Sequence, residues 1–459
     1  MVMKLPIILS ILSVLAASCY SQDNYLENSN NIIKKIEVFN QDFNKNYGEI
    51  EKLLVSTLQK EGKEFFIKNK YYEILGRFEP TLKTYCEIVE ELHDENCDLL
   101  FSYLHLNDIE NVKKQQEKIK DDPNYFIYQY FHEFEDSKKT LDSKLISIKY
   151  DQRVEEFAQA VFENAHKAEE FIVSEWKDFA PPKIRVILLN SNGPGPYNPN
   201  MNETVLPVKS APISAAIGTI SSIVHETFHF SNIYAINKMS TFGTEWGMNS
   251  FKFLDEGYAQ LIEQKFLNSQ QKSRKLADIY ARNVILEGKF DLKDLKTRWI
   301  ELFSSNDVSI YTLALSFAYF LEDRYGKEKH KNLFFPTAPI AEDSWLKYVN
   351  SYFGTDLDSL IDIYQADMKT EMPKLSEAEL KNFCGTYYCE SEKLERKIIY
   401  KDGSLFYWRN ETSETKLQAL DKTNLVMGGS AELIFDFATK KKSFVLSSMN
   451  GEDITFMAK

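Results

Sequence analysis

The stretch SSIVHETFHFSN, residues 221–232, has two histidines four residues apart and a glutamate directly after the first histidine. Residues four apart are neighbours on one face of an α-helix, so His225 and His229 can each offer an imidazole nitrogen to a single metal ion. Glu226 lies a quarter turn away, too far to be a ligand but well placed to hold a water molecule on the open side of the metal. The alternative is that three polar residues fall on one helix by coincidence. The buried stripe expected for this helix consists of Ile217, Ile220, Val224 and Phe228.

A two-histidine site needs a third ligand to hold zinc tightly, and the segment FKFLDEGYAQLIEQKF, residues 251–266, offers one. Glu256 and Gln260 lie together on one face of the helix that this segment predicts. Gly257 leaves out a side chain next to Glu256, which would let this helix approach another helix closely. Glu256 is therefore the predicted third ligand, and a solvated helix face is the alternative interpretation of its carboxylate. The buried stripe expected for this second helix consists of Leu254, Tyr258, Leu261, Ile262 and Phe266.

Two other carboxylates compete for the role of third ligand. Glu245 lies in the glycine-rich stretch TFGTEWG, which would have to fold back toward the histidines. Asp255 is next to Glu256 but points to another face of the predicted helix. We therefore expect zinc, as one Zn²⁺ per chain, to be held by His225, His229 and Glu256.

Together, HETFH at 225–229 and EGYA at 256–259 resemble the two-part motif of the gluzincin metallopeptidases, in particular the peptidase MA-like group. The resemblance covers roughly residues 183–335 and implies a zincin-like catalytic core, a small mixed sheet with an edge strand plus active-site helices. It also implies that an extended substrate lies along the edge strand, here TVLPVK. In such enzymes a tyrosine or histidine often steadies the oxyanion; Tyr311 is the first choice for this role and Tyr319 the second, although each could equally be a core residue.

The chain departs from the family pattern in two ways. The two ligand segments are further apart than in the best-known members, so NIYAINKMSTFGTEWGMNS, residues 232–250, is expected to be an inserted loop. The G-x-M-E-N signature, which captures a free substrate N-terminus in the aminopeptidase branch, is absent from the sequence. We therefore expect cleavage within a peptide, by an endopeptidase rather than an aminopeptidase.

The function that the resemblance implies is hydrolysis of peptide or protein substrates by a metal-activated water, with Glu226 as the general base. One alternative is a catalytically silent protein that keeps the metallopeptidase-like fold for binding, but a pure binder has no need of a carboxylate at position 226. A second alternative is an adhesion protein at the bacterial surface. The net charge of −13 and the lack of a long run of Lys and Arg argue against nucleic acid as a partner.

The N-terminal segment is typical of a secretory leader: residues 1–21 have one lysine, then an apolar stretch, then small residues. In one interpretation Cys19 is acylated and provides the only membrane attachment. In the other, cleavage after Ser21 releases the chain. Both predict an exported protein of the periplasm, the cell surface or the medium.

Four further cysteines follow the leader. An even count in an exported chain permits two local disulfides, and buried free thiols are the equally weighted alternative. These residues are Cys86, Cys97, Cys384 and Cys389.

The length of 459 residues and the shifts in composition predict a multidomain α+β protein. After the leader, residues 22–179 read as a helical domain, because apolar residues recur at helical spacing and nothing alternates convincingly. Residues 180–372 read as the metallopeptidase domain, and residues 373–459 as a small antiparallel β domain with hairpin turns such as KDG.

Two strands are expected at the start of the metallopeptidase domain. Residues 184–189 have the composition of a buried strand. Residues 204–209 form a second strand, and Pro207 predicts a place for it at the sheet edge because proline cannot donate to a ladder. Residues 253–370 are expected to return to helix.

Overall fold

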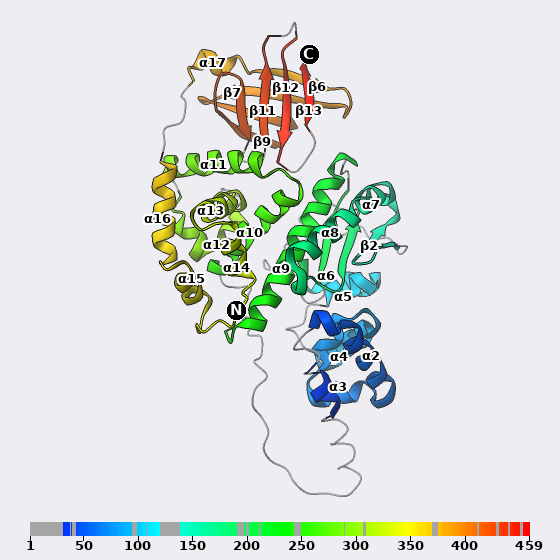
Figure 1. The fold of residues 1–459 in the computed structure, drawn as a ribbon. Helices are drawn as coiled ribbons and strands as arrows, with labels where there is room; N and C mark the ends of the chain where they lie inside the picture. Colours follow the sequence, from blue (N-terminus) through cyan, green and yellow to red (C-terminus); the bar gives the residue numbers. More distant parts are fainter. Residues whose placement is uncertain are drawn as a thin grey trace, which may run out of the picture. The chain divides into compact units, whose positions relative to one another are not determined.

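The computed structural model describes most of the chain (Figure 1). The described residues are 31–36, 38, 43–93, 99–106, 108–119, 138–190, 197–198, 202–209, 211, 213–242, 249–288, 290–305, 309–369, 375–410, 413–427, 431–438, 441–449 and 453–459. The leader with Cys19, Cys97 and the rival ligand Glu245 lie outside these residues. The expected domain boundary at 372–373 also lies outside them and stays a prediction.

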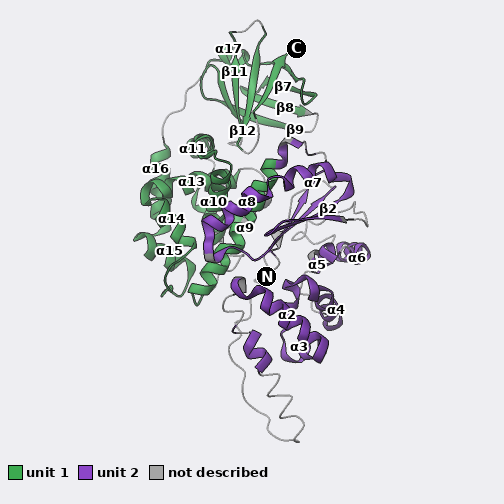
Figure 2. Ribbon diagram, turned by 45° about the vertical axis from the view of Figure 1, so that its right-hand side comes forward, with its two compact units in different colours: residues 1–3, 217–459 green, residues 4–216 purple. Residues whose placement is uncertain are grey.

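The chain forms two compact units (Figure 2). We call residues 4–216, purple and keyed as unit 2 in Figure 2, the first unit, because they come first in the sequence. Residues 217–459 with 1–3, green and keyed as unit 1, are the second unit. The described helices of the first unit are α2 (Phe43–Glu61), α3 (Lys63–Asn69), α4 (Leu82–Leu92), α5 (Leu100–Leu106), α6 (Ile109–Ile119), α7 (Glu155–Phe162) and α8 (Ala165–Trp176). Its strands are β1 (Lys138–Asp142), β2 (Ile146–Asp151), β3 (Ile184–Leu189), β4 (Tyr197–Asn198) and β5 (Glu203–Pro207). The helices of the second unit are α9 (Ala216–Met239), α10 (Asn249–Phe266), α11 (Gln270–Glu287), α12 (Lys293–Ser305), α13 (Ile310–Tyr325), α14 (Lys327–Phe334), α15 (Trp345–Phe353), α16 (Leu357–Met368) and α17 (Glu377–Lys381).

The sheet of the first unit has the strand order β1-β2-β3-β5-β4. Strands β2, β3 and β5 run parallel, and β1 and β4 are antiparallel to their neighbours. The predicted strand at 184–189 is confirmed as β3, whose six residues are all buried. Ile187, Leu189 and Val205 pack in one cluster with residues of α4 and α5. The mixed sheet of the predicted α+β fold is thus present.

The prediction of helix alone for residues 22–179 is wrong at residues 138–151, where β1 and β2 form a hairpin that α7 and α8 follow. Strand β2 buries Ile146, Ile148 and Tyr150 and leaves the residues between them partly exposed. This alternation is the period of a strand, but it spans only five residues beside long helical patterns. Its pairing with β3, which lies far along the sequence, is what fixes it as a strand.

The expected edge position of the second strand is also wrong, because β5 lies between β3 and β4. Strand β4 pairs only with Glu203 and Thr204, upstream of Pro207. A proline prevents donation only at its own position, so a two-residue strand can still pair with the other end of β5.

Helices α10 and α13 lie side by side in the second unit, and Gly257 lies at their closest approach. A Cβ atom built on Gly257 would lie 2.5 Å from the carbonyl oxygen of Ala314. The predicted close approach at this glycine is therefore confirmed. The return to helix expected for residues 253–370 is confirmed as well, by α10 to α16.

The C-terminal β region is a closed antiparallel barrel with the strand order β10-β11-β12-β13-β6-β7-β8-β9. Its strands are β6 (Gly385–Cys389), β7 (Leu394–Lys401), β8 (Ser404–Asn410), β9 (Ser413–Ala419), β10 (Asn424–Met427), β11 (Ala431–Asp436), β12 (Ser443–Ser448) and β13 (Ile454–Ala458). Asp402 and Gly403 both have positive φ between paired Lys401 and Ser404, so the KDG stretch forms the predicted hairpin turn. Aromatic side chains such as Tyr387 fill the interior.

The barrel and the helices of the second unit share a hydrophobic cluster. Leu261 of α10, Leu276 of α11 and Leu315 of α13 pack there with Val426 and Met449 of the barrel. Helix α10 carries Glu256, so the barrel supports the helix that bears the predicted third ligand.

Cys384 and Cys389 of the barrel are free thiols, and so is Cys86 of the first unit. The structure therefore contradicts a local disulfide between Cys384 and Cys389 and favours the free-thiol alternative. No helix in the described ranges is both long enough and apolar enough to cross a membrane.

Candidate metal centre

Helix α9 carries both histidines and is held by the apolar stripe that its sequence predicts. Of the four predicted residues, Ile220, Val224 and Phe228 are fully buried, and Ile217 is half-buried. His225 and His229 are buried as well, with 6% and 1% of their surfaces exposed. Helix α9 continues to Met239, so the first residues of the predicted inserted loop, 232–239, are helical and the prediction is wrong there. The last two turns are helical because Ala235 and Ile236 are fully buried in the core.

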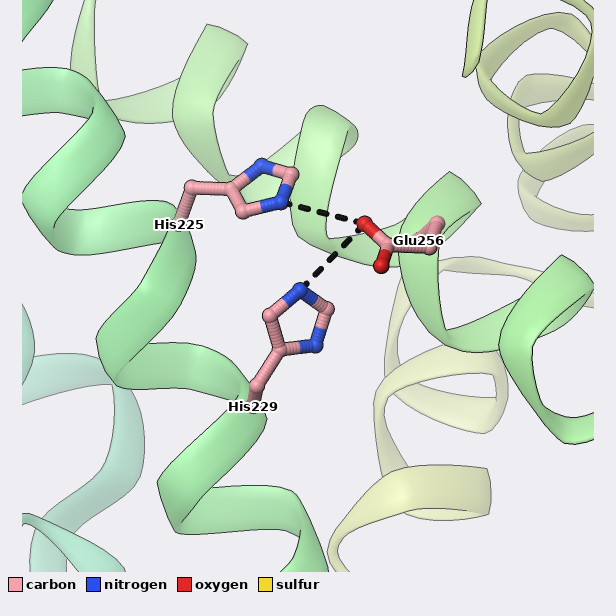
Figure 3. A group of neighbouring side chains, drawn as sticks. All are labelled: His225, His229 and Glu256. Carbon is pink, nitrogen blue, oxygen red and sulfur yellow. Dashed lines mark hydrogen bonds and ion pairs between the residues drawn. The ribbon is translucent and has the colours of Figure 1, made fainter. Parts of the chain in front are cut away.

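The imidazoles of His225 and His229 converge on the carboxylate of Glu256 from α10 (Figure 3). The distance from Nε2 of His225 to Oε2 of Glu256 is 3.2 Å, and the distance from Nε2 of His229 to the same oxygen is 3.3 Å. One potential ligand atom from each of the three residues lies within 4.8 Å of the others. These are the distances expected of a group that can close around one cation.

The remaining ring nitrogen of each histidine faces a second carboxylate. Nδ1 of His229 lies 2.7 Å from Oδ2 of Asp255, and Nδ1 of His225 lies 3.5 Å from Oε2 of Glu263. Both carboxylates are themselves held, because Asn232 donates to Asp255 and Ser221 donates to Glu263. A carboxylate on the far nitrogen fixes the tautomer and orientation of a metal-binding imidazole and raises its basicity. Neither Nδ1 contact has the geometry of a hydrogen bond, so both are ion pairs. Both Nε2 atoms point toward Glu256, as a metal site requires.

The electrostatics of the three predicted ligands are those of a cation site. Burial would lower the pKa of His225, but the carboxylates of Glu256 and Glu263 outweigh burial and raise the pKa well above its usual value. Burial would likewise lower the pKa of His229, but the carboxylates of Asp255 and Glu256 outweigh burial and raise this pKa above its usual value. For Glu256, burial would raise the pKa, but Lys252 and the histidines hold it well below the usual value. The site therefore stabilises positive charge between α9 and α10.

Glu226 is half-buried beside the two histidines and is not a member of the metal-binding group. Burial raises the pKa of its carboxyl group, while His225 and His229 act in the opposite direction. A raised pKa suits a group that must accept a proton and later return it near neutral pH.

Tyr311 and Tyr319, the two tyrosine candidates, are in different surroundings. Burial raises the pKa of Tyr311 well above its usual value, and the carboxylates of Glu256 and Glu226 raise it further. Tyr319 belongs to the cluster shared with the barrel, and its hydroxyl lies 2.5 Å from Oγ of Ser273. Tyr319 is thus a core residue, and Tyr311 remains the candidate.

The structure thus brings together His225, Glu226, His229 and Glu256. Asp255, a rival ligand in the sequence, instead contacts the far nitrogen of His229.

Sequence reasoning missed Glu263 and Lys252, although helical spacing gives a signal for both. They lie two turns after and one turn before Glu256, on the side of α10 that meets the site.

No protein-family model matches the chain, and no curated protein matches its sequence. The chain is similar to the solved structure of an aminopeptidase N family protein from Idiomarina loihiensis, with a TM-score of 0.35, 13% identity and coverage of 70% of this chain and 67% of that one. It is also similar to an M1 zinc metallopeptidase from Deinococcus radiodurans, with a TM-score of 0.32, 16% identity and coverage of 52% of this chain and 53% of that one. This chain therefore spans about half of the Deinococcus protein, and the TM-scores are too low for either likeness to indicate which reaction the site performs.

Proposed function

We propose that this protein is a zinc-dependent peptidase whose metal is held by His225, His229 and Glu256. The observation that carries the proposal is the paired arrangement of the imidazoles. Each directs Nε2 toward Glu256 and has Nδ1 against a buried carboxylate. Two histidines and one carboxylate are a common donor set of catalytic zinc sites, which keep one position open. The donor chemistry therefore fits Zn²⁺.

Zinc bound here would supply a Lewis acid that lowers the pKa of a water molecule and polarises a peptide carbonyl. Glu226 orients this water and accepts its proton, and it then returns the proton to the leaving amine. Tyr311 donates its hydroxyl hydrogen to the carbonyl oxygen as negative charge develops there. Asp255 and Glu263 hold the imidazoles in the orientation that leaves Nε2 free for the metal.

The proposal extends to cleavage within a peptide by an exported enzyme. Cleavage at internal bonds is supported by the absence of a G-x-M-E-N segment from the sequence. Export is supported by the leader-like residues 1–21, with acylation at Cys19 as one possible outcome of processing.

A peptide mixture incubated with the purified protein, with and without a zinc chelator, tests the reaction. We expect chelator-sensitive cleavage, and we expect N-terminally acetylated peptides to be cut as readily as free ones. The variant Glu226→Gln should keep zinc but lose roughly a hundred- to ten-thousand-fold in rate, because the amide cannot accept the proton.

The matched control is Glu328→Gln, which changes an exposed glutamate in the first turn of α14. It should retain the parent rate. Normal hydrolysis by Glu226→Gln would refute the assigned base, and loss of zinc from that variant would make Glu226 a ligand. A parent protein that binds zinc but cleaves no peptide would favour a catalytically silent binding protein.

A further inference from the structure

Lys252 is a buried lysine inside the metal centre, one helical turn before Glu256 on α10. Only 8% of its surface is exposed. Its ammonium donates to Oε1 of Glu256 over 2.9 Å and lies 3.8 Å from Oδ2 of Asp255. A lysine is seldom buried unless its charge is paired, and here its partner is the predicted metal ligand itself.

The two oxygens of Glu256 have different partners. Oε2 faces Nε2 of both histidines, at 3.2 Å and 3.3 Å, while Oε1 accepts the hydrogen bond from Lys252. A carboxylate can bind a metal through one oxygen or through both. A charge-assisted hydrogen bond to one oxygen ties that oxygen down and leaves the other free.

We propose that Lys252 is a positioning residue that restricts Glu256 to one metal-binding oxygen. By keeping Oε1 away from the ion, Lys252 limits the number of protein oxygens around the metal and preserves the open position that a water molecule needs. The inference depends on the metal site of the proposed function, but not on peptide hydrolysis.

Cobalt provides the test, because Co²⁺ replaces Zn²⁺ in many sites and absorbs visible light more strongly with four ligands than with five or six. In the variant Lys252→Met, Oε1 loses its donor and can turn toward the metal. We expect weaker absorption per bound Co²⁺ than in the parent protein, because the ion gains a second oxygen ligand from Glu256. Lys252→Arg, which keeps a charged donor, should restore the absorption of the parent protein.

Lys275→Met is the matched control, because it removes another lysine–carboxylate pair of the second unit, the 2.8 Å contact with Glu432 of the barrel. It should leave the cobalt spectrum unchanged. A folded Lys252→Met protein with the parent spectrum would overturn the inference, and so would a Lys252→Arg protein whose spectrum matches that of Lys252→Met.

If Lys252→Met does not fold, as judged by circular dichroism, then Lys252→Arg and Lys252→Gln decide the question. Both side chains retain an N–H donor. A parent-like spectrum in these two variants supports the inference, and an altered spectrum in both refutes it. These readouts follow the metal alone, so they stand even if the protein cleaves no peptide.

Discussion

Replacing Gly257 by alanine should damage the protein, although alanine is the better helix former. The gain in helix propensity is about 1 kcal/mol. Against it, the new Cβ would lie 2.5 Å from the backbone oxygen of Ala314. An ordinary contact needs about 3.5 Å, so α10 and α13 would have to separate by roughly 1 Å. Overpacking of this kind typically costs about 1–3 kcal/mol, and here the obstructing atom is backbone and cannot rotate away.

We therefore expect Gly257→Ala to lower the free energy of unfolding by up to about 2 kcal/mol, which is the overpacking cost less the propensity gain. For a unit of this size the melting temperature should fall by about 2–4 °C for each kcal/mol. Because Glu256 is the adjacent residue, zinc affinity should fall as well. Thermal unfolding followed by circular dichroism, together with zinc titration, measures both effects.

Gly48→Ala provides the control, because Gly48 lies inside α2 and its new Cβ would have no neighbour within 4 Å. It makes the same chemical change without the close contact. It should raise stability by about 0.5–1 kcal/mol. If Gly257→Ala were as stable as Gly48→Ala and bound zinc like the parent protein, the close approach of α10 and α13 would not be what requires glycine.

Four further outcomes are expected. Asp255→Asn and Glu263→Gln should each lower zinc affinity about ten- to a hundredfold in a competition titration, and unchanged affinity would show that these carboxylates do not orient the histidines. Zinc binding should weaken as the pH falls through the raised pKa values of His225 and His229, because protons then compete for the ligand nitrogens; an affinity independent of pH would contradict this. His330→Phe should raise the free energy of unfolding by about 1 kcal/mol in denaturant titrations. His330 is buried, both of its ring nitrogens lack a hydrogen-bond partner among the described residues, and burial lowers its pKa to about 3. Destabilisation by this substitution would show that one of the ring nitrogens has a partner. A chain ending near Lys374 should keep its zinc but melt at a lower temperature than the full chain, because the cluster around Leu261 loses Val426 and Met449; loss of zinc would show that α10 cannot fold without the barrel.

The sequence was sufficient to predict that His225, His229 and Glu256 come together, because helical spacing is a local property. His225 and His229 share a face whatever surrounds α9, and Gly257 next to Glu256 indicated a second, closely packed helix. The KDG hairpin was predictable for the same reason, since Asp402 and Gly403 tolerate positive φ.

Features that depend on contacts between distant segments could not be predicted in this way. Strand β2 needs β3 as its partner, and the order of β5 and β4 depends on residues at the far end from Pro207. The roles of Asp255 and Glu263 depend on the angle at which α10 meets α9, which spacing within either helix does not determine. From the sequence alone, a carboxylate next to a predicted ligand, such as Asp255, can therefore be interpreted equally well as a rival ligand or as the partner of a histidine.

The burial of so many acidic groups explains why this site should hold a cation. Asp255, Glu256 and Glu263 are each at least 94% buried, and the basic side chain of Lys252 contacts Asp255 and Glu256. Burying an uncompensated carboxylate costs several kcal/mol, so the excess negative charge must be offset. Without a metal the imidazoles can do this by taking up protons, which is the meaning of the raised pKa values of His225 and His229. A divalent cation can offset the same negative charge, and its binding releases those protons. The buried carboxylates that destabilise the folded chain therefore also make metal binding favourable.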